Sequence, residues 1–207
     1  MGNLFRTIGP GAILLAAAIG ALSGILIAPI TTVYYDTGFL VGLKGFVGAM
    51  VHGLTNGEFL DRKKFWPIFE RAEALDVPIY LHPTYPHPDA VKAYFGGYED
   101  LARAAWGFAI DTSTHFLRVV FSGAFDAYPK LQFILGHLGE GIPFAMHRLH
   151  DHTYQSAAKR GLKKTPLEYL RDNLLVTTSG NWYEPAFVCT LLALGVDKIL
   201  FAIDWPY

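Results

Sequence analysis

The run LQFILGH at residues 131–137 shows the pattern on which the fold prediction rests. It is short and almost continuously apolar, as expected for a strand of a parallel sheet that is buried on both faces. The same pattern recurs in VPIYLHP at 77–83, NLLVTTSG at 173–180 and DKILFAID at 197–204, and FVGAMVH at 46–52 is a shorter example. Each run predicts a strand that is followed by a polar side chain.

Between these runs, apolar residues recur at helical spacing. Helices are predicted over FWPIFERAEAL (65–75), from Asp100 to Pro129, from Pro143 to about Lys159, from Pro166 to Arg171 and over EPAFVCTLLALG (184–195). An alternation of strands and helices indicates parallel strands joined by crossover helices. No Gly/Ser-rich or charged linker interrupts it, so we expect one α/β domain over residues 41–207.

The polar residues that follow the strands indicate where an active site lies. They are His52, His82, His137, Ser179 and Asp204. In a parallel barrel the carboxyl ends of all strands open onto one face, which holds the active site. In a doubly wound sheet they converge only near the switch point. Five strands with polar ends therefore favour the parallel barrel.

Several common catalytic motifs are missing from the sequence. No G-x-G-x-x-G follows a strand, no G-x-x-x-x-G-K-[ST] phosphate loop is present, and neither Ser122 nor Ser179 stands in a G-x-S-x-G elbow. The remaining chemistry is that of histidine and carboxylate, which are good ligands for zinc or manganese. A metal held between barrel strands can polarise a substrate oxygen.

Each candidate residue also has a structural interpretation. His82 could serve only as a hydrogen-bonding group at a strand end, and Asp204 could cap the loop after the last strand. Glu140 could support a helix N-terminus. His52 could simply fill the mouth of its strand, and Arg148 could be an ordinary surface arginine.

Composition narrows the possible functions. The chain has 207 residues and a net charge of −1, so it has no basic field that would attract nucleic acid. A single cysteine, Cys189, excludes an internal disulfide framework, and its apolar surroundings favour a buried position. The histidines of HRLHDH (147–152) are more consistent with a solvated helix face than with a metal site.

The N-terminal segment has a different character. Residues 7–35 carry no charged side chain and Arg6 precedes them, so this stretch is long enough for a membrane anchor or an export signal. Its abundance of Ala, Gly and Pro favours a buried helix or an irregular core segment instead. We treat residues 1–40 as an apolar segment of undetermined role, with membrane contact through residues 10–30 as the less favoured interpretation.

Four stretches resemble one enzyme family. They are NGEFLDRKKFWPIFERAEALDVPIYLHP, LRVVFSGAFDAYPKLQFILGHLGEGIPF, NLLVTTSGNW and DKILFAIDWPY. The resemblance covers residues 44–207 and is to the amidohydrolase-related (amidohydrolase 2) family, especially its 2,3-dihydroxybenzoate and γ-resorcylate decarboxylases. It implies an α/β fold of the (β/α)8 TIM-barrel type. It also implies a metal-dependent, non-oxidative carboxy-lyase that acts on a hydroxybenzoate-like aromatic acid, usually as a cytoplasmic homo-oligomer.

The resemblance also implies roles for individual residues. His82 and Asp204 match ligands of a zinc or manganese ion, and Asp204 also matches a residue of proton transfer. His137, partnered by Glu140, matches a histidine that polarises or protonates the substrate. Arg148 matches an arginine near the substrate or a neighbouring subunit. His52, at a strand mouth, is a further candidate for substrate binding.

The sequence departs from the family pattern in its first part. The E-x-H or H-x-H pair of the first strand, which supplies two further metal ligands, is not found. The matched strands correspond to about the fourth to the eighth, with the first strands and the final helix missing or replaced. Two alternatives stay open. The same metal could activate water in a metal-dependent hydrolase of the same superfamily, and the missing ligands are also consistent with a truncated, inactive fragment.

Overall fold

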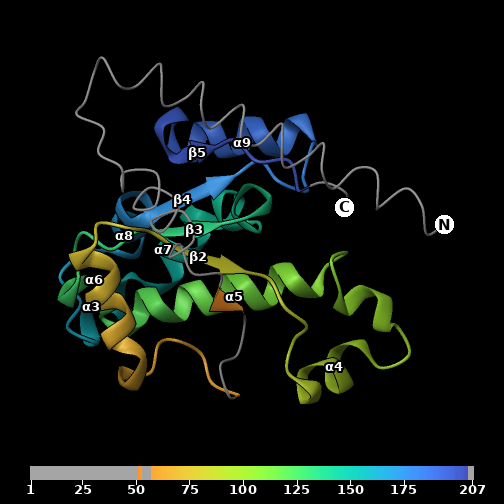
Figure 1. Ribbon diagram of the computed structural model, residues 1–207, viewed down its shortest axis with the longest axis horizontal. Coiled ribbons are helices and arrows are strands. Elements are labelled where there is room, and N and C mark those ends of the chain that lie inside the picture. The colour runs from red at the N-terminus through yellow and green to blue at the C-terminus, as the bar shows by residue number, and fades with distance from the viewer. Residues whose placement is uncertain (1–50, 53–56, 205–207) are drawn as a thin grey trace, which may run out of the picture. The chain divides into compact units, whose positions relative to one another are not determined.

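The computed structural model describes residues 51–52 and 57–204. In this part of the chain, five parallel strands form one sheet in the order β1-β2-β3-β4-β5. The strands are β1 (Val51–His52), β2 (Ile79–His82), β3 (Phe133–Leu135), β4 (Leu174–Thr177) and β5 (Ile199–Leu200), and Figure 1 shows β2, β3 and β4 side by side. Each strand pairs with the next in sequence, as in the wall of a (β/α) barrel and unlike a doubly wound sheet.

The strand register brings the polar strand ends to one edge. His52 pairs with His82 at the ends of β1 and β2. Leu135 of β3 pairs with Leu81 of β2 on one side and with Val176 of β4 on the other. The residues that leave the strands, including His137 and Asp204, therefore emerge at the same edge of the sheet.

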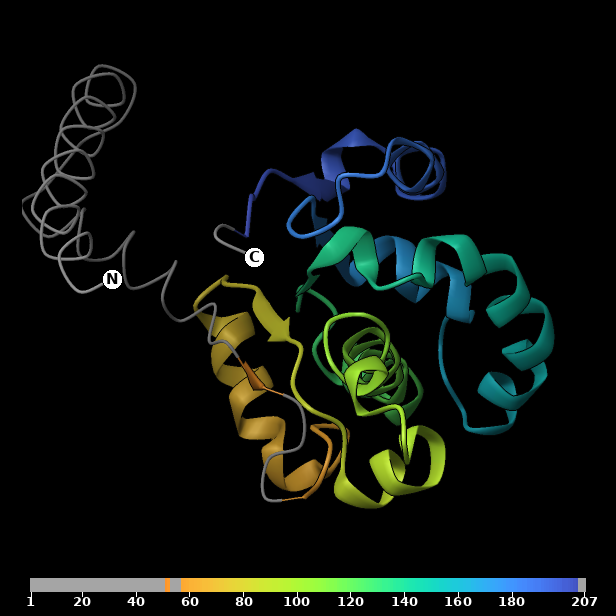
Figure 2. The same cartoon turned by 90° about the vertical axis from the view of Figure 1, so that its right-hand side faces the viewer.

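The helices lie between the strands in sequence. They are α3 (Trp66–Ala74), α4 (Pro88–Phe95), α5 (Gly107–Ser122), α6 (Ala124–Ala127), α7 (Ile142–Lys159), α8 (Pro166–Asn173) and α9 (Glu184–Leu194), with 3-10 turns η1 (Lys63–Phe65), η2 (Glu99–Ala102), η3 (His137–Gly139) and η4 (Val196–Lys198). Figure 2 shows α5, α7 and α9 on the same side of the strands. Right-handed crossovers in a sheet of sequential order place the helices in this way.

Local sequence signals account for most helix starts. Proline occupies the first turn of five of the described helices, at positions 67, 88, 143, 166 and 185. The proline φ suits a helix, and the missing N–H is one that the first turn does not use. Helix α8 also has a capping box, in which Thr165 N–H donates to Glu168 Oε2 at 2.7 Å and Glu168 N–H donates to Thr165 Oγ1 at 3.4 Å.

Two predicted elements differ from those observed. The helix expected from Asp100 to Pro129 is broken between η2 and α5, because the chain folds back so tightly that a Cβ on Gly107 would lie 2.3 Å from the Ala102 carbonyl oxygen. The last strand is also shorter than expected. After Leu200 the side chain of Thr178 takes over the pairing, since its Oγ1 donates to the Ala202 carbonyl at 2.7 Å and accepts from the Ala202 N–H at 3.1 Å.

The core is centred on Phe133 of β3, which is fully buried. Its ring lies 5.8 Å from Phe69 of α3, 5.7 Å from Phe116 of α5 and 5.8 Å from Phe125 of α6. Aromatic pairs at such distances add to the stabilisation that comes from burial alone. This cluster attaches three helices to the central strand.

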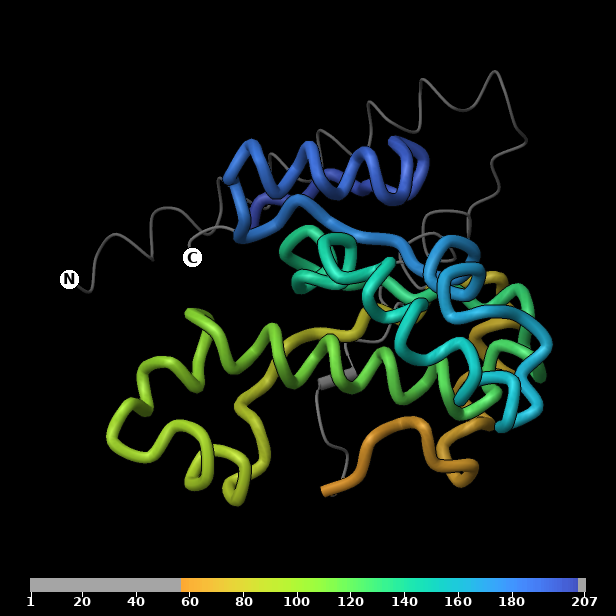
Figure 3. Tube along the Cα trace, turned by 180° about the vertical axis from the view of Figure 1, so that it is seen from behind, coloured from red at the N-terminus to blue at the C-terminus, as the bar shows by residue number. Residues whose placement is uncertain are grey.

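The connection from β2 to α5 makes an excursion that contains α4 and η2. Figures 1 and 3 show it standing out from the other described helices. Among the described residues, none of the helices has the length and apolarity needed to cross a bilayer. The predictions for residues 1–40 and for the start of the FVGAMVH run fall on residues outside the described part.

Candidate active site

A cavity of about 710 Å³ opens at the carboxyl edge of the strands. Its polar side is lined by His82, His137, Glu140, Asn181 and Asp204. Its other walls are mainly apolar and come from Pro83 and from residues within 104–110, a segment that leads into α5. The cavity is therefore lined by histidines and carboxylates together with an apolar segment.

His137 lies between two carboxylates. Its Nδ1 is 2.5 Å from Glu140 Oε1, and its Nε2 is 3.4 Å from Asp204 Oδ2. The Glu140 side chain is only 4% exposed, which strengthens the first contact. The hydrogen bond to Glu140 raises the pKa of His137, burial opposes this, and Asp204 adds to the increase. The geometry favours a ring that carries a proton on both nitrogens.

The loop that holds His137 and Glu140 is a left-handed turn. The φ angles of residues 137–141 are 52°, 57°, 82°, 53° and 80°. Each non-glycine residue in this conformation costs about 1–2 kcal/mol, and such residues concentrate at functional sites. The packing offsets this cost, since Leu138 is buried and Gly139 lies so close to Val176 and Pro143 that a Cβ there would clash.

His82 presents a defined tautomer to the cavity. Its Nδ1 lies 2.9 Å from the carbonyl oxygen of Pro83. A carbonyl only accepts hydrogen bonds, so Nδ1 carries the proton and the lone pair of the neutral ring is on Nε2. A hydrogen bond from one ring nitrogen to a carbonyl is the usual way in which a metal-binding histidine is oriented.

The donor set fits part of a metal site. His82 and Asp204 line the same cavity and supply the nitrogen and oxygen ligands that zinc and manganese accept. Among the described residues, no group of three or more His, Cys, Asp or Glu side chains is arranged to hold a metal ion. The cavity offers His82 and Asp204 as two donors of suitable chemistry.

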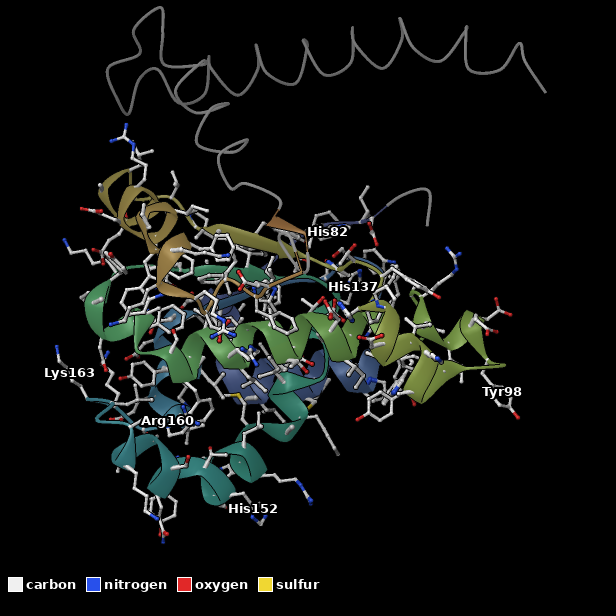
Figure 4. The ribbon with its side chains drawn as sticks, turned by 90° about the horizontal axis from the view of Figure 1, so that it is seen from below. His82, Tyr98, His137, His152, Arg160 and Lys163 are labelled. Carbon is white, nitrogen blue, oxygen red and sulfur yellow. The ribbon has the colours of Figure 1, made fainter. Side chains whose placement is uncertain are left out.

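The structure brings together four of the six predicted site residues. His82, His137, Glu140 and Asp204 share the cavity, and Figure 4 shows the two histidines close to each other. Arg148 is exposed on α7 and does not line the cavity. His52 stands beside His82 in the strand register, but its side chain is outside the described part.

Histidines outside the site are placed as solvated or structural groups. His147 and His152 are exposed on α7, and Figure 4 shows His152 far from His82 and His137. His87 caps α4, since its Nδ1 accepts from the Asp89 N–H at 3.2 Å. His115 is fully buried and accepts from the Leu60 N–H at 2.9 Å.

Sequence reasoning singled out Ser179 but missed Tyr80 and Thr177, which join it beside the site. Tyr80, Thr177 and Ser179 form a chain of hydroxyl groups between β2 and β4, with distances of 3.4 Å and 2.6 Å. Their alternation along the strands was a signal that they face the inside of the barrel. The apolar wall at Ala104–Ile110 had no such signal, because the sequence there reads as helix.

A second cavity of about 490 Å³ adjoins the first and shares His137, Gly141 and Asn181 with it. Its other walls are mainly apolar and come from the first turns of α7 and α9. Cys189 lines this cavity and is half-buried, so it is more accessible than its apolar sequence surroundings suggested.

The comparisons with known proteins agree on one family. The Amidohydro_2 model, described as amidohydrolase, matches residues 37–207. A γ-resorcylate decarboxylase of Polaromonas sp. strain JS666 is 40% identical over 172 residues, which are 79% of this chain and 52% of that protein. The chain thus spans about half the length of the curated relatives that it matches.

Two solved structures are similar in fold as well as in sequence. A 2,6-dihydroxybenzoate decarboxylase in complex with 2,6-dihydroxybenzoate has a TM-score of 0.69 and 33% identity, and the match covers 83% of this chain and 57% of that one. A dihydroxybenzoic acid decarboxylase from Polaromonas sp. JS666, with bound manganese and the inhibitor 2-nitroresorcinol, has a TM-score of 0.70 and 35% identity over 82% and 55% of the chains. The predicted amidohydrolase-type barrel fold is confirmed.

Proposed function

The chain belongs to the amidohydrolase family, and from this premise we propose that it serves in the metal-dependent, non-oxidative decarboxylation of a hydroxybenzoate-like acid. The observation that carries the proposal is His137, held between Glu140 and Asp204 at the polar side of a cavity with an apolar wall. A planar aromatic acid matches such a cavity, with its ring against the wall and its charged groups toward the histidines.

We assign His82 and Asp204 as two metal ligands, through His82 Nε2 and the Asp204 carboxylate. When bound, a zinc or manganese ion supplies Lewis-acid stabilisation of negative charge on the substrate oxygens. The relatives support manganese, since a related decarboxylase was solved with that ion bound. The Pro83 carbonyl holds the His82 ring in the tautomer that ligation needs.

His137, Glu140 and Asp204 are assigned to proton transfer. A proton held at Asp204 or at His137 Nε2 adds to the ring carbon that bears the carboxylate. The bond from that carbon to the carboxylate then breaks, its electron pair restores the aromatic ring, and carbon dioxide leaves. Solvent returns the proton to the donor, and Glu140 keeps the His137 ring in position throughout.

The remaining predicted residues are assigned to substrate binding. Arg148 is exposed, which supports a role at a neighbouring subunit of a homo-oligomer rather than in its own cavity. His52 ends the strand next to His82, which supports a place at the mouth of the same site. By resemblance to its relatives, we assign the protein to the cytoplasm.

The test is a turnover assay with the full chain loaded with Mn²⁺. We expect 2,6-dihydroxybenzoate to lose its carboxyl group and give resorcinol, measured by chromatography. Glu140→Gln should lower kcat by about 10²-fold or more, because positioned acid–base groups contribute 10²–10⁴-fold. Glu70→Gln, an exposed change on α3, is the matched control and should leave kcat unaltered. A metal-loaded chain that decarboxylates no hydroxybenzoate would refute the proposal.

A further inference from the structure

Gly180 lies against both members of the His137–Asp204 pair. It follows β4 in a left-handed conformation, with φ of +63°. A Cβ built on it would lie 2.5 Å from His137 Cδ2, 3.0 Å from His137 Nε2 and 2.9 Å from Asp204 Oδ2. All three distances are at or below the 3.0 Å limit that real Cβ atoms respect. No side chain fits there while His137 and Asp204 keep their places.

We propose that Gly180 is a positioning residue, whose bare Cα is what allows His137 and Asp204 to meet. His137 has little room to retreat, since Glu140 holds its other nitrogen at 2.5 Å and its backbone belongs to the left-handed turn. A methyl group at position 180 would therefore separate Nε2 from Oδ2, which are 3.4 Å apart. The functional meaning of this contact rests on the proposed function, whereas the contact itself does not.

The chain contains a matched control for backbone strain. Gly161 also has a left-handed φ, of +76°, but a Cβ there meets nothing within 4 Å. Gly161→Ala thus introduces the conformational penalty of an alanine in the left-handed region, but no contact like that between a Cβ at position 180 and His137 or Asp204. Any effect of Gly180→Ala beyond that of Gly161→Ala reports on His137 and Asp204.

The first readout is the imidazole spectrum of the full chain labelled with ¹⁵N-histidine, with the His137 signals assigned by their loss in His137→Ala. We expect Gly180→Ala to shift the His137 signals, whereas Gly161→Ala leaves them in place. These spectra are recorded without substrate or metal. Their outcome therefore does not depend on whether the proposed decarboxylation occurs.

The second readout is a double-mutant cycle of urea unfolding. Gly180→Ala should lower the folding equilibrium constant at least tenfold more than Gly161→Ala does, and this excess should shrink in the His137→Ala background to the part that comes from Asp204. If Gly180→Ala does not fold but Gly180→Ala/His137→Ala does, the proposal also stands. The proposal would be overturned if the His137 signals did not shift and Gly180→Ala lowered the folding equilibrium constant equally with and without His137. It would also be overturned if neither Gly180→Ala nor Gly180→Ala/His137→Ala folded while His137→Ala alone did.

Discussion

At the scale of single residues, the buried polar groups of α5 divide into partnered and unpartnered atoms. His115 Nε2 accepts the Leu60 N–H, but His115 Nδ1, Asp111 Oδ2 and Thr112 Oγ1 are buried without a hydrogen bond to any described residue. Burial raises the pKa of Asp111 from 3.8 to about 6 and lowers the pKa of His115 from 6.5 to about 4. Burial thus favours the neutral form of both side chains, and their contributions to stability depend on pH in opposite directions.

We expect Asp111→Asn to stabilise the protein at neutral pH. Because the pKa of Asp111 is higher in the folded state, its contribution is fully present below about pH 3.8 and is lost as the pH rises to about 6. This pKa difference corresponds to at most about 3 kcal/mol. Urea unfolding should show the gain at pH 7.5 and its loss near pH 4.

The control for this prediction is Asp151→Asn, an exposed change on α7 that should be nearly neutral at both pH values. If Asp111→Asn gave the same free energy of unfolding as the unmodified chain at pH 7.5, the desolvation of Asp111 would not be a source of instability.

At the scale of elements, α8 is fixed at both of its ends and along one side. Its capping box satisfies the first turn, and Asn173 in its last turn donates to the Leu131 carbonyl at 2.8 Å. Tyr169 is buried, accepts the Lys164 N–H at 3.1 Å and donates to Asp126 of α6. Burial and the bond to Asp126 raise the pKa of Tyr169 to about 12. These contacts position β4, which follows α8 directly.

Thr165→Ala should lower the free energy of unfolding by about 1 kcal/mol, because it removes the N-cap acceptor for the Glu168 N–H. Thermal or urea unfolding measures this loss. Thr114→Ala, an exposed change within α5, keeps all caps and should be neutral or slightly stabilising. Equal effects of the two substitutions would show that the capping box contributes nothing.

At the scale of the whole molecule, the site joins distant parts of the described chain. His82 ends β2, His137 and Glu140 follow β3, Gly180 follows β4 and Asp204 follows β5. Only the parallel, sequential order of the strands brings these positions to one edge. A ligand that bound His82 and Asp204 together would link the end of β2 to the end of β5.

We expect Mn²⁺ to raise the stability of the whole molecule. At about 100 times its Kd, an ion that binds only the folded state adds about 2.7 kcal/mol to the free energy of unfolding. Differential scanning fluorimetry with Mn²⁺, and again after chelation by EDTA, measures the effect. His82→Ala should abolish the increase, while His152→Ala, at an exposed position on α7, should retain it. An increase of equal size in His82→Ala would place the ion elsewhere.

Much of this architecture follows from the sequence by itself. Continuous apolar runs predict buried strands, helical spacing predicts the helices, and prolines at positions 67, 143, 166 and 185 mark helix starts. These signals are local, because burial pattern and backbone preference act within a few residues. The polar strand ends also indicated His82, His137 and Asp204 as neighbours, since parallel strands bring their carboxyl ends together.

Tertiary structure alone decided how those neighbours meet. The left-handed turn at 137–141 directs His137 toward Glu140, and Gly180 leaves the space in which Asp204 approaches. The excursion through α4 returns the Ala104–Ile110 segment as the apolar wall, although its sequence reads as helix. These features depend on contacts between residues far apart in the chain, and the packing of distant strands and helices outweighs the local backbone preference there.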